Sequence, residues 1–115
     1  IIYDPIGDCY TEPAFRAIGW KGKYLVVGFA AGEITKLPIN LTLLKGASLV
    51  GVFWGTFTGL ESDANQKNIA EINQLLSEGK IKPLISKEIP MENAVDAIKM
   101  IGNRGVIGKI VLVNK

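Results

Sequence analysis

The first two-thirds of the chain alternate between short apolar runs and amphipathic segments. Residues 1–3, 23–28 and 48–54 are apolar on both faces, and the last two runs are rich in the β-branched residues that buried parallel strands prefer. The segments between and after them place apolar residues at spacings of three and four, the period of a helical face. Strands that alternate with helices predict a parallel sheet with crossover connections. The pattern therefore predicts an α/β fold.

Polar residues and glycines predict where the helices begin and end. Thr11 is the predicted N-cap of the first helix, and Gly46 ends a short helix over residues 41–45. The longest helix is predicted to begin at Ser62 or Asp63 and to end at Gly79. It carries apolar residues on one face and polar residues between them.

The last third of the chain has a different pattern. A strand over residues 83–89 is followed by a helix that begins at Pro90 and ends at Gly102, and a last strand covers residues 107–113. We expect this strand-helix-strand segment to be separate from the parallel sheet that precedes it.

The composition suggests that the chain needs a partner surface. A hydrophobic content of 48% and a mean hydropathy of +0.25 are high for a chain of 115 residues. No apolar run approaches the roughly 20 residues of a membrane helix, so we predict no membrane contact and a cytoplasmic location. The chain begins within an apolar segment and without a methionine, which predicts a piece of a larger fold.

Charge and the reactive residue types exclude several function classes. The 13 basic and 11 acidic residues are mixed along the chain, so no nucleic-acid partner is predicted. One cysteine, Cys9, and no histidine exclude a disulfide framework, histidine catalysis and the common zinc ligand sets within this segment. We expect the thiol of Cys9 to be inert and predict no metal.

Candidate chemistry lies where the predicted parallel strands end. Ligands of such sheets bind beyond the carboxyl ends of the strands, which here are residues 4–8, 28–32 and 52–55. The glycines in these stretches let a flat ligand approach the backbone. No phosphate-binding fingerprint is present, because residues 28–32 have the wrong glycine spacing and residues 102–108 follow a helix instead of opening one.

Several residues near these ends have two roles open to them. Asp4 follows a strand, as catalytic or ribose-binding acids do, and equally suits a cap of the following turn. Phe53 and Trp54 suit stacking on a ligand ring or packing within the protein. Arg104 suits a phosphate contact or the end of a helix dipole.

Five segments together resemble one enzyme family. They are residues 3–7, 22–29 and 44–52, followed near the end by 78–83 and 105–112. In order and spacing they are similar to the zinc-free, zeta-crystallin-like quinone oxidoreductases of the medium-chain dehydrogenase/reductase superfamily. The resemblance implies that residues 1–82 are the second half of a Rossmann-type, dinucleotide-binding domain. It further implies that residues 83–115 belong to the catalytic domain, so that the chain is the C-terminal third of the enzyme.

The family reaction is hydride transfer from NADPH to a quinone or another activated alkene or carbonyl, with no metal. Ten residues match the family's cofactor segments, and none matches a catalytic residue. The first segment, at the nicotinamide end, is Leu25, Val26, Val27, Gly28 and Phe29, and the second is Val50, Gly51 and Val52 with Phe53 and Trp54 just beyond. Asp8 stands where family members often place an amide that contacts the cofactor, and an ionised carboxylate cannot donate that hydrogen bond.

The glycine-rich pyrophosphate turn of this family lies upstream of the matched segments. We therefore expect this chain alone to bind NADPH weakly and to be inactive. The resemblance also implies a homodimer joined through the strand from Leu49 to Trp54. Two other classes stay open: a small non-catalytic nucleotide-binding module, and a self-association domain.

Overall fold

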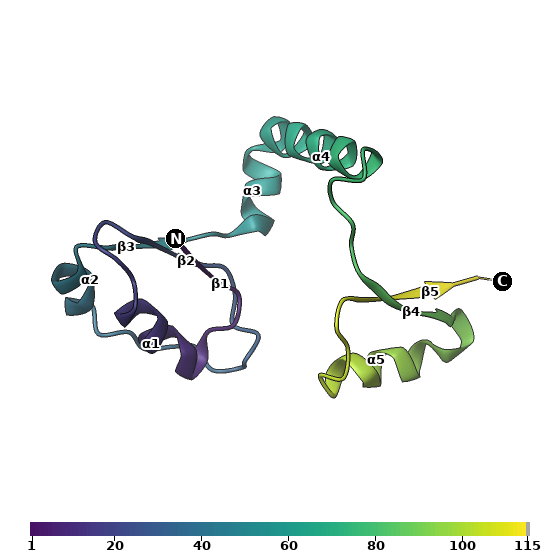
Figure 1. Cartoon of the computed structure of the whole chain (residues 1–115), viewed down its shortest axis with the longest axis horizontal. Coiled ribbons are helices and arrows are strands. Elements are labelled where there is room, and N and C mark those ends of the chain that lie inside the picture. The colour runs from purple at the N-terminus through teal and green to yellow at the C-terminus, as the bar shows by residue number, and fades with distance from the viewer. Residues whose placement is uncertain (115) are drawn as a thin grey trace. The chain divides into compact units, whose positions relative to one another are not determined.

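The computed structural model describes residues 1–114, which divide into two compact units, Ile1–Ser62 and residues 63–114 (Figure 1). The first unit contains a three-stranded sheet and the second a two-stranded one. In chain order, the first unit holds β1 (Ile2–Asp4), the 3-10 turn η1 (Asp8–Tyr10), α1 (Thr11–Arg16), β2 (Lys23–Val26), α2 (Asn40–Lys45), β3 (Ser48–Gly51) and α3 (Trp54–Leu60).

The sheet of the first unit is parallel throughout, in the order β1-β2-β3. Its register aligns Tyr3 with Leu25 and Leu25 with Val50. Because side chains alternate along a strand, these three share one face of the sheet, and their chain neighbours share the other. The predicted α/β fold with parallel Rossmann-type strands is confirmed.

One face of this sheet carries the core of the unit. Tyr24 from β2 packs on Phe15 of α1 with ring centroids 5.5 Å apart, and Ile18 and Leu41 complete the buried cluster. Gly46 ends α2 in the left-handed conformation, with φ of 54°. A side chain at Gly46 would collide with the indole of Trp20, so the position requires glycine twice over.

The opposite face of the sheet is open. Tyr3 is 65% exposed and Val50 38% exposed, and the flanking Ile1 is almost fully exposed. β1 and β3 are both edge strands. Apolar side chains of both edge strands are therefore exposed on this face.

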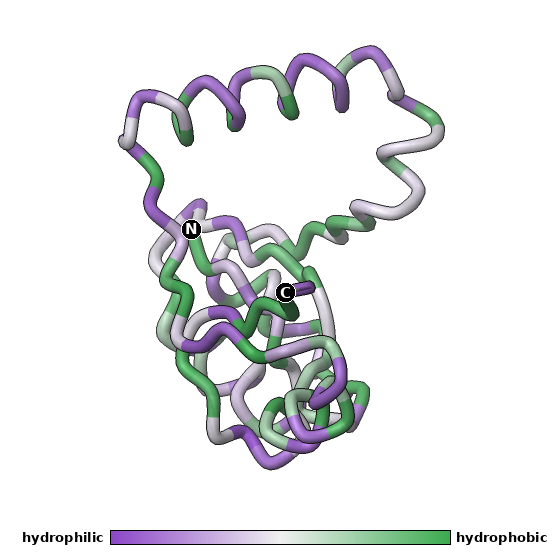
Figure 2. Tube along the Cα trace, turned by 90° about the vertical axis from the view of Figure 1, so that its right-hand side faces the viewer, coloured by the Kyte–Doolittle hydropathy of each residue, from purple (hydrophilic) through white to green (hydrophobic). Residues whose placement is uncertain are grey.

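The second unit contains the long helix α4, whose polar and apolar residues alternate along the trace (Figure 2). Strands β4 and β5 are parallel, with an irregularity in register between Ile85 and Lys87. The elements are α4 (Ser62–Ser77), β4 (Ile85–Pro90), the 3-10 turn η2 (Met91–Asn93), α5 (Ala94–Gly102) and β5 (Lys109–Val113).

Two sequence predictions are wrong in detail. The strand predicted over residues 48–54 stops at Gly51, and Trp54 begins α3 instead. The reason is that β2 leaves the sheet after Val26, so the last ladder bond runs from Val52 N to Val26 O, at 2.9 Å. Beyond it Phe53 has no neighbouring strand, and its carbonyl accepts a helical bond from Phe57 N.

The second error concerns the start of α1. Thr11 is the first residue of the helix and not its N-cap, which is Tyr10. The hydroxyl of Thr11 is turned instead to the carboxylate of Asp4. The predicted ends of α4 near Gly79 and of α5 at Gly102 agree with the structure, while several strand boundaries differ by one or two residues. The last helix was predicted to begin at Pro90, but α5 begins at Ala94, after the 3-10 turn η2.

Candidate functional site

The carboxyl ends of the three parallel strands meet at one edge of the sheet. Asp4 is aligned with Val26, and Val26 with Gly51. Past the strand ends, Val27 N donates to Asp4 O at 2.9 Å, which keeps the chain after β2 beside the chain after β1. The two segments predicted to bind the cofactor, residues 25–29 and 50–54, lie next to each other because β2 pairs with β3.

The carboxylate of Asp4 is buried at this edge and accepts hydrogen bonds from four groups. Its Oδ1 accepts the backbone N–H groups of Ile6 and Gly7, both at 2.9 Å. Its Oδ2 accepts the hydroxyl of Tyr24 at 2.6 Å and that of Thr11 at 3.0 Å. Of the two roles open to Asp4, the cap of the following turn is confirmed.

This network shifts two pKa values. Burial raises the pKa of the Asp4 carboxyl, but the hydrogen bonds from Tyr24, the two turn amides and Thr11 outweigh it and hold the pKa below the usual 3.8. Burial and the bond to Asp4 raise the pKa of Tyr24 to about 12. Asp4 is therefore ionised and Tyr24 protonated at neutral pH.

The loop after β2 rests on the turn after β1. Ala30 N donates to Pro5 O at 3.1 Å, and Ala31 N donates to Ile6 O at 2.9 Å. Gly7 has φ of 73°, and a Cβ there would lie 2.8 Å from Cδ1 of Phe29. The ring of Phe29 accordingly lies against the backbone of the turn, and Phe29 remains 43% exposed.

An apolar, aromatic cavity of about 300 Å³ lies where β3 ends. Phe57 of α3 contributes to it and packs on Trp54 with ring centroids 5.1 Å apart. A Cβ at Gly51 would meet no atom within 4 Å, so the backbone there is open to a ligand. The lining residues are Gly51, Val52, Phe53, Trp54 and Phe57.

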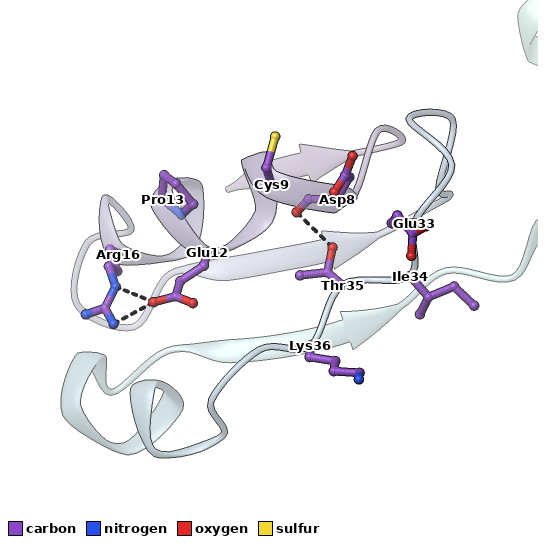
Figure 3. Close-up of a pocket in the computed structure, with 9 residues that line it drawn as sticks. All are labelled: Asp8, Cys9, Glu12, Pro13, Arg16, Glu33, Ile34, Thr35 and Lys36. Atoms are coloured by element: carbon purple, nitrogen blue, oxygen red, sulfur yellow. Dashed lines mark hydrogen bonds and ion pairs between the residues drawn. The ribbon is translucent and has the colours of Figure 1, made fainter.

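A larger cavity, of about 580 Å³, lies between the start of α1 and the segment 33–36 (Figure 3). Its side chains carry both charges: Glu12 pairs with Arg16 at 2.6 Å, and Glu33 and Lys36 lie on the other wall. None of the ten predicted cofactor residues lines it. Because mixed, water-facing charges select no ligand class, we place the candidate site at the strand ends and not here. Asp8 and the exposed Cys9 lie at this cavity.

The structure brings most of the predicted site residues together. Leu25 and Val26 pair with Val50 and Gly51, and Val52 bonds to the end of β2. Phe53 and Trp54 lie at the start of α3, beside the same strand end. Arg104 follows the end of α5, as predicted, and belongs to the second unit.

Sequence reasoning missed Tyr24 and Thr11 as partners of Asp4, and Phe57 as a wall of the aromatic cavity. The sequence did contain an indication for Phe57, because it follows Phe53 by four residues and Trp54 by three, the spacings that bring side chains to one face of a helix. The partners of Asp4 had none, because a long-range hydrogen bond leaves no periodicity.

Two findings concern metal and membrane. Within residues 1–114, no three side chains of the Cys, Asp and Glu types lie close enough together to hold a metal ion. No helix in the same range is long and apolar enough to cross a bilayer.

The parallel strands, crossover helices and open carboxyl ends define an α/β protein with a Rossmann-type sheet. Comparison with known families makes the assignment specific. Residues 1–112 match the family described as zinc-binding dehydrogenase, and the chain belongs to that family.

Individual relatives agree with this assignment. The chain is 31% identical over 97% of its length to quinone oxidoreductase-like protein 2 of Bos taurus, and 30% identical over 100% of its length to the homologous protein of Nematostella vectensis. It spans 32% of the length of each of these relatives. The resemblance to the quinone oxidoreductases of the medium-chain superfamily is thus confirmed.

The fold has solved counterparts. A mycobacterial protein solved in complex with NADPH superposes with a TM-score of 0.80, covering 96% of this chain and 34% of that protein, at 18% identity. At that identity the likeness establishes the fold alone.

Proposed function

We propose that this chain supplies the nicotinamide end of the cofactor site in an NADPH-dependent quinone oxidoreductase. The observation that carries the proposal is the convergence of two apolar segments, ending at Phe29 and at Trp54, on adjacent parallel strand ends. Support also comes from the quinone oxidoreductase-like relatives and from the structural neighbour that binds NADPH.

The strand ends suit the ring end of a nicotinamide cofactor. The backbone is open at Gly51, and the aromatic cavity beside it is apolar. When bound, NADPH supplies the hydride that reduces a quinone or another electron-poor alkene or carbonyl. The residues of this chain hold the ring end, and their apolar side chains keep water from it.

We further propose that the reaction is independent of zinc, as in the branch that the sequence resembles. This chain has no histidine and one cysteine, so it offers no common zinc ligand set. Dialysis of the complete protein against a chelator should leave its rate of quinone reduction unchanged. A rate that falls and is restored by zinc would contradict this part of the proposal.

A matched pair of glycine substitutions tests the cofactor site. A Cβ added at Gly51 or at Gly59 would meet no atom within 4 Å, so we expect both Gly51→Val and Gly59→Val to fold. Only Gly51 lies at the proposed ring site. In the complete protein that contains this chain, Gly51→Val should raise the Kd for NADPH roughly tenfold, a loss of about 1.4 kcal/mol of binding free energy. Gly59→Val should change it less than about twofold, and equal Kd values for both variants would refute the proposed site.

The chain by itself should show no NADPH-dependent quinone reduction above background. The proposed enzyme also needs the pyrophosphate-binding turn, and the sequence of this chain contains no such fingerprint. Turnover by the isolated chain at about 10 per second, the median for enzymes, would contradict this expectation.

A second proposal concerns self-association, and edge strand β3 favours it. Leu49 and Val50 are partly exposed, and Trp54 just beyond the strand is half exposed. We propose a symmetric homodimer joined from Leu49 to Trp54, since isologous contacts are the commonest way for soluble chains to close. Sedimentation of the chain should report about twice its mass of 12.4 kDa, and Val50→Lys should restore the monomer mass. A wild-type chain that sediments as a monomer at micromolar concentration would contradict the dimer.

A further inference from the structure

We propose that the carboxylate of Asp4 is the positioning group of the candidate cofactor site: it holds the turn over residues 5–7 in the one shape that supports Phe29. Asp4 contacts no ligand in this role and acts through the turn. The inference rests on the proposed function and names a residue that its cofactor contacts depend on.

The two carboxylate oxygens have separate tasks. Oδ2 faces the core, where it accepts the hydroxyls of the fully buried Tyr24 and of Thr11. Oδ1 faces the turn, where it accepts the N–H groups of Ile6 and Gly7. The carboxylate thereby joins the turn to the core, with one oxygen accepting from each side.

The turn in its fixed shape carries the loop after β2. The carbonyls of Pro5 and Ile6 accept the N–H groups of Ala30 and Ala31, which flank Phe29 on its C-terminal side. On the N-terminal side, a Cβ at Gly28 would lie 3.3 Å from Pro5 O, so the two backbones are in close contact there as well. The backbone around Phe29 is therefore held from the turn on both sides.

The side chain of Phe29 depends on the same turn. Its ring lies over Gly7, at a φ of 73° that a side-chain-bearing residue rarely adopts. If the Oδ1 bonds are lost, Ile6 and Gly7 lose the constraint that keeps this conformation. Phe29 would then lose both its backbone support and its contact surface.

A double-mutant cycle on the complete protein tests the coupling, with the Kd for NADPH as the readout. Asp4→Asn keeps the shape of the side chain but replaces one acceptor oxygen with a donor. We expect Asp4→Asn and Phe29→Ala each to raise the Kd roughly tenfold, and the double variant to be no weaker than either single variant. Strict additivity would mean that Asp4 does not act through Phe29, and would overturn the inference.

A structural role for Asp4 is separated from positioning by Tyr24→Phe. That variant removes a bond to Oδ2 and destabilises the fold, but it leaves both Oδ1 bonds to the turn intact. We expect it to lower the melting temperature while changing the Kd less than about threefold. If the Kd follows the loss of stability equally in Asp4→Asn and Tyr24→Phe, Asp4 is merely structural.

A readout without cofactor separates the two proposals. If the wild-type protein does not bind NADPH, the proposed function fails, and hydrogen exchange at Ala30 and Ala31 then decides the role of Asp4. Faster exchange of these two amides in Asp4→Asn but not in Tyr24→Phe would support the positioning role. Unchanged exchange in Asp4→Asn would overturn it.

Discussion

Residues 1–62 and residues 63–114 each contain both strands and helices, but they bury very different sets of apolar side chains. The first unit encloses Phe15, Ile18, Tyr24 and Leu41 between its sheet and two helices. In the second unit Ala97 is the one buried hydrophobic residue among those described. Backbone pairing is thus present in both units, while a core of large side chains is present in only one.

The second unit exposes the apolar face of its helix α5. Helix α5 carries Val95, Ile98 and Ile101, all more than half exposed. A short helix gains most of its stability from packing its apolar face, and α5 has nine residues. Residues 63–114 therefore leave most of their apolar side chains unburied, whereas the first unit encloses a core and leaves one face of its sheet open.

The largest expected effect tests this contrast directly. Phe15→Ala removes a ring that is 0% exposed and should lower the free energy of unfolding by about 3–5 kcal/mol. Ile98→Ala in the second unit truncates a side chain that is 68% exposed and should cost less than about 1 kcal/mol. Urea unfolding of the two variants measures both values. Equal losses would mean that Ile98 lies in a core after all, supplied by a self-associated chain.

Lowering the pH provides the next test of the contrast between the two units, because the first unit contains the buried carboxylate of Asp4. The pKa of Asp4 is lower in the folded chain than its unfolded value of 3.8, so Asp4 stabilises the fold above that pH and the contribution is lost as pH falls through the folded pKa. Asp4→Asn should cost about 1–3 kcal/mol at pH 7 and progressively less in acid. Urea unfolding at about pH 7, 5 and 3 provides the measurement.

The second unit supplies the control for this acid effect. The pKa of Glu78 is also lowered, by hydrogen bonds from Lys80 and Gln74, but its carboxylate lies at the surface. Water screens such a group, so Glu78→Gln should leave the pH dependence of unfolding unchanged. The prediction for Asp4 is wrong if Asp4→Asn costs the same stability at every pH.

A smaller effect on stability is expected at alkaline pH from Tyr24, whose hydroxyl donates to Asp4. The folded pKa of Tyr24 is about 12, above its unfolded value of 10.0. Tyr24 therefore contributes stability that is fully present below pH 10.0 and is lost as pH rises through about 12. Tyr24→Phe should cost about 1.5 kcal/mol at pH 7, the lower end of the range for a hydrogen bond to a charged group, and flatten the alkaline limb. Ultraviolet titration of the wild type and of Tyr24→Phe checks the pKa itself, because the difference between the two curves belongs to Tyr24.

The sequence predicted every strand and most of the helices in their order, but not α3. Apolar runs predicted all three strands of the first sheet, and Gly46 and Gly79 marked helix ends because both adopt a positive φ. Where a run continued past its partner strand, prediction failed: residues 48–54 are uniformly apolar, and the end of β3 depends on where β2 leaves the sheet. The residues of one strand do not show where the neighbouring strand in the sheet ends.

The candidate site was predictable in a similar, partial way. The rule that ligands bind at the carboxyl ends of parallel strands selected one edge of the sheet, and the resemblance selected the residues from Leu25 and from Val50 onward, which lie at that edge. The network around Asp4 depends on Tyr24 and Thr11, which are 20 and 7 residues away in sequence. Such a contact becomes visible only when packing has brought the two elements together.

The smallest expected effect concerns charges at the surface of the well-packed unit. Glu12 and Arg16 form an ion pair one turn apart on α1, with both side chains more than one-third exposed. A pair of this kind contributes about 0.3–0.5 kcal/mol, since water and salt screen it. Glu12→Gln should therefore lower the free energy of unfolding by no more than this, and the loss should vanish at 1 M salt, where charges are screened within about 3 Å. Among the predicted losses in the free energy of unfolding, that of Glu12→Gln is the smallest and that of Phe15→Ala is the largest. A loss above about 1 kcal/mol that persists in high salt would show that the cavity between α1 and residues 33–36 is more tightly packed than its exposed walls indicate, and that the core of the first unit extends to its surface.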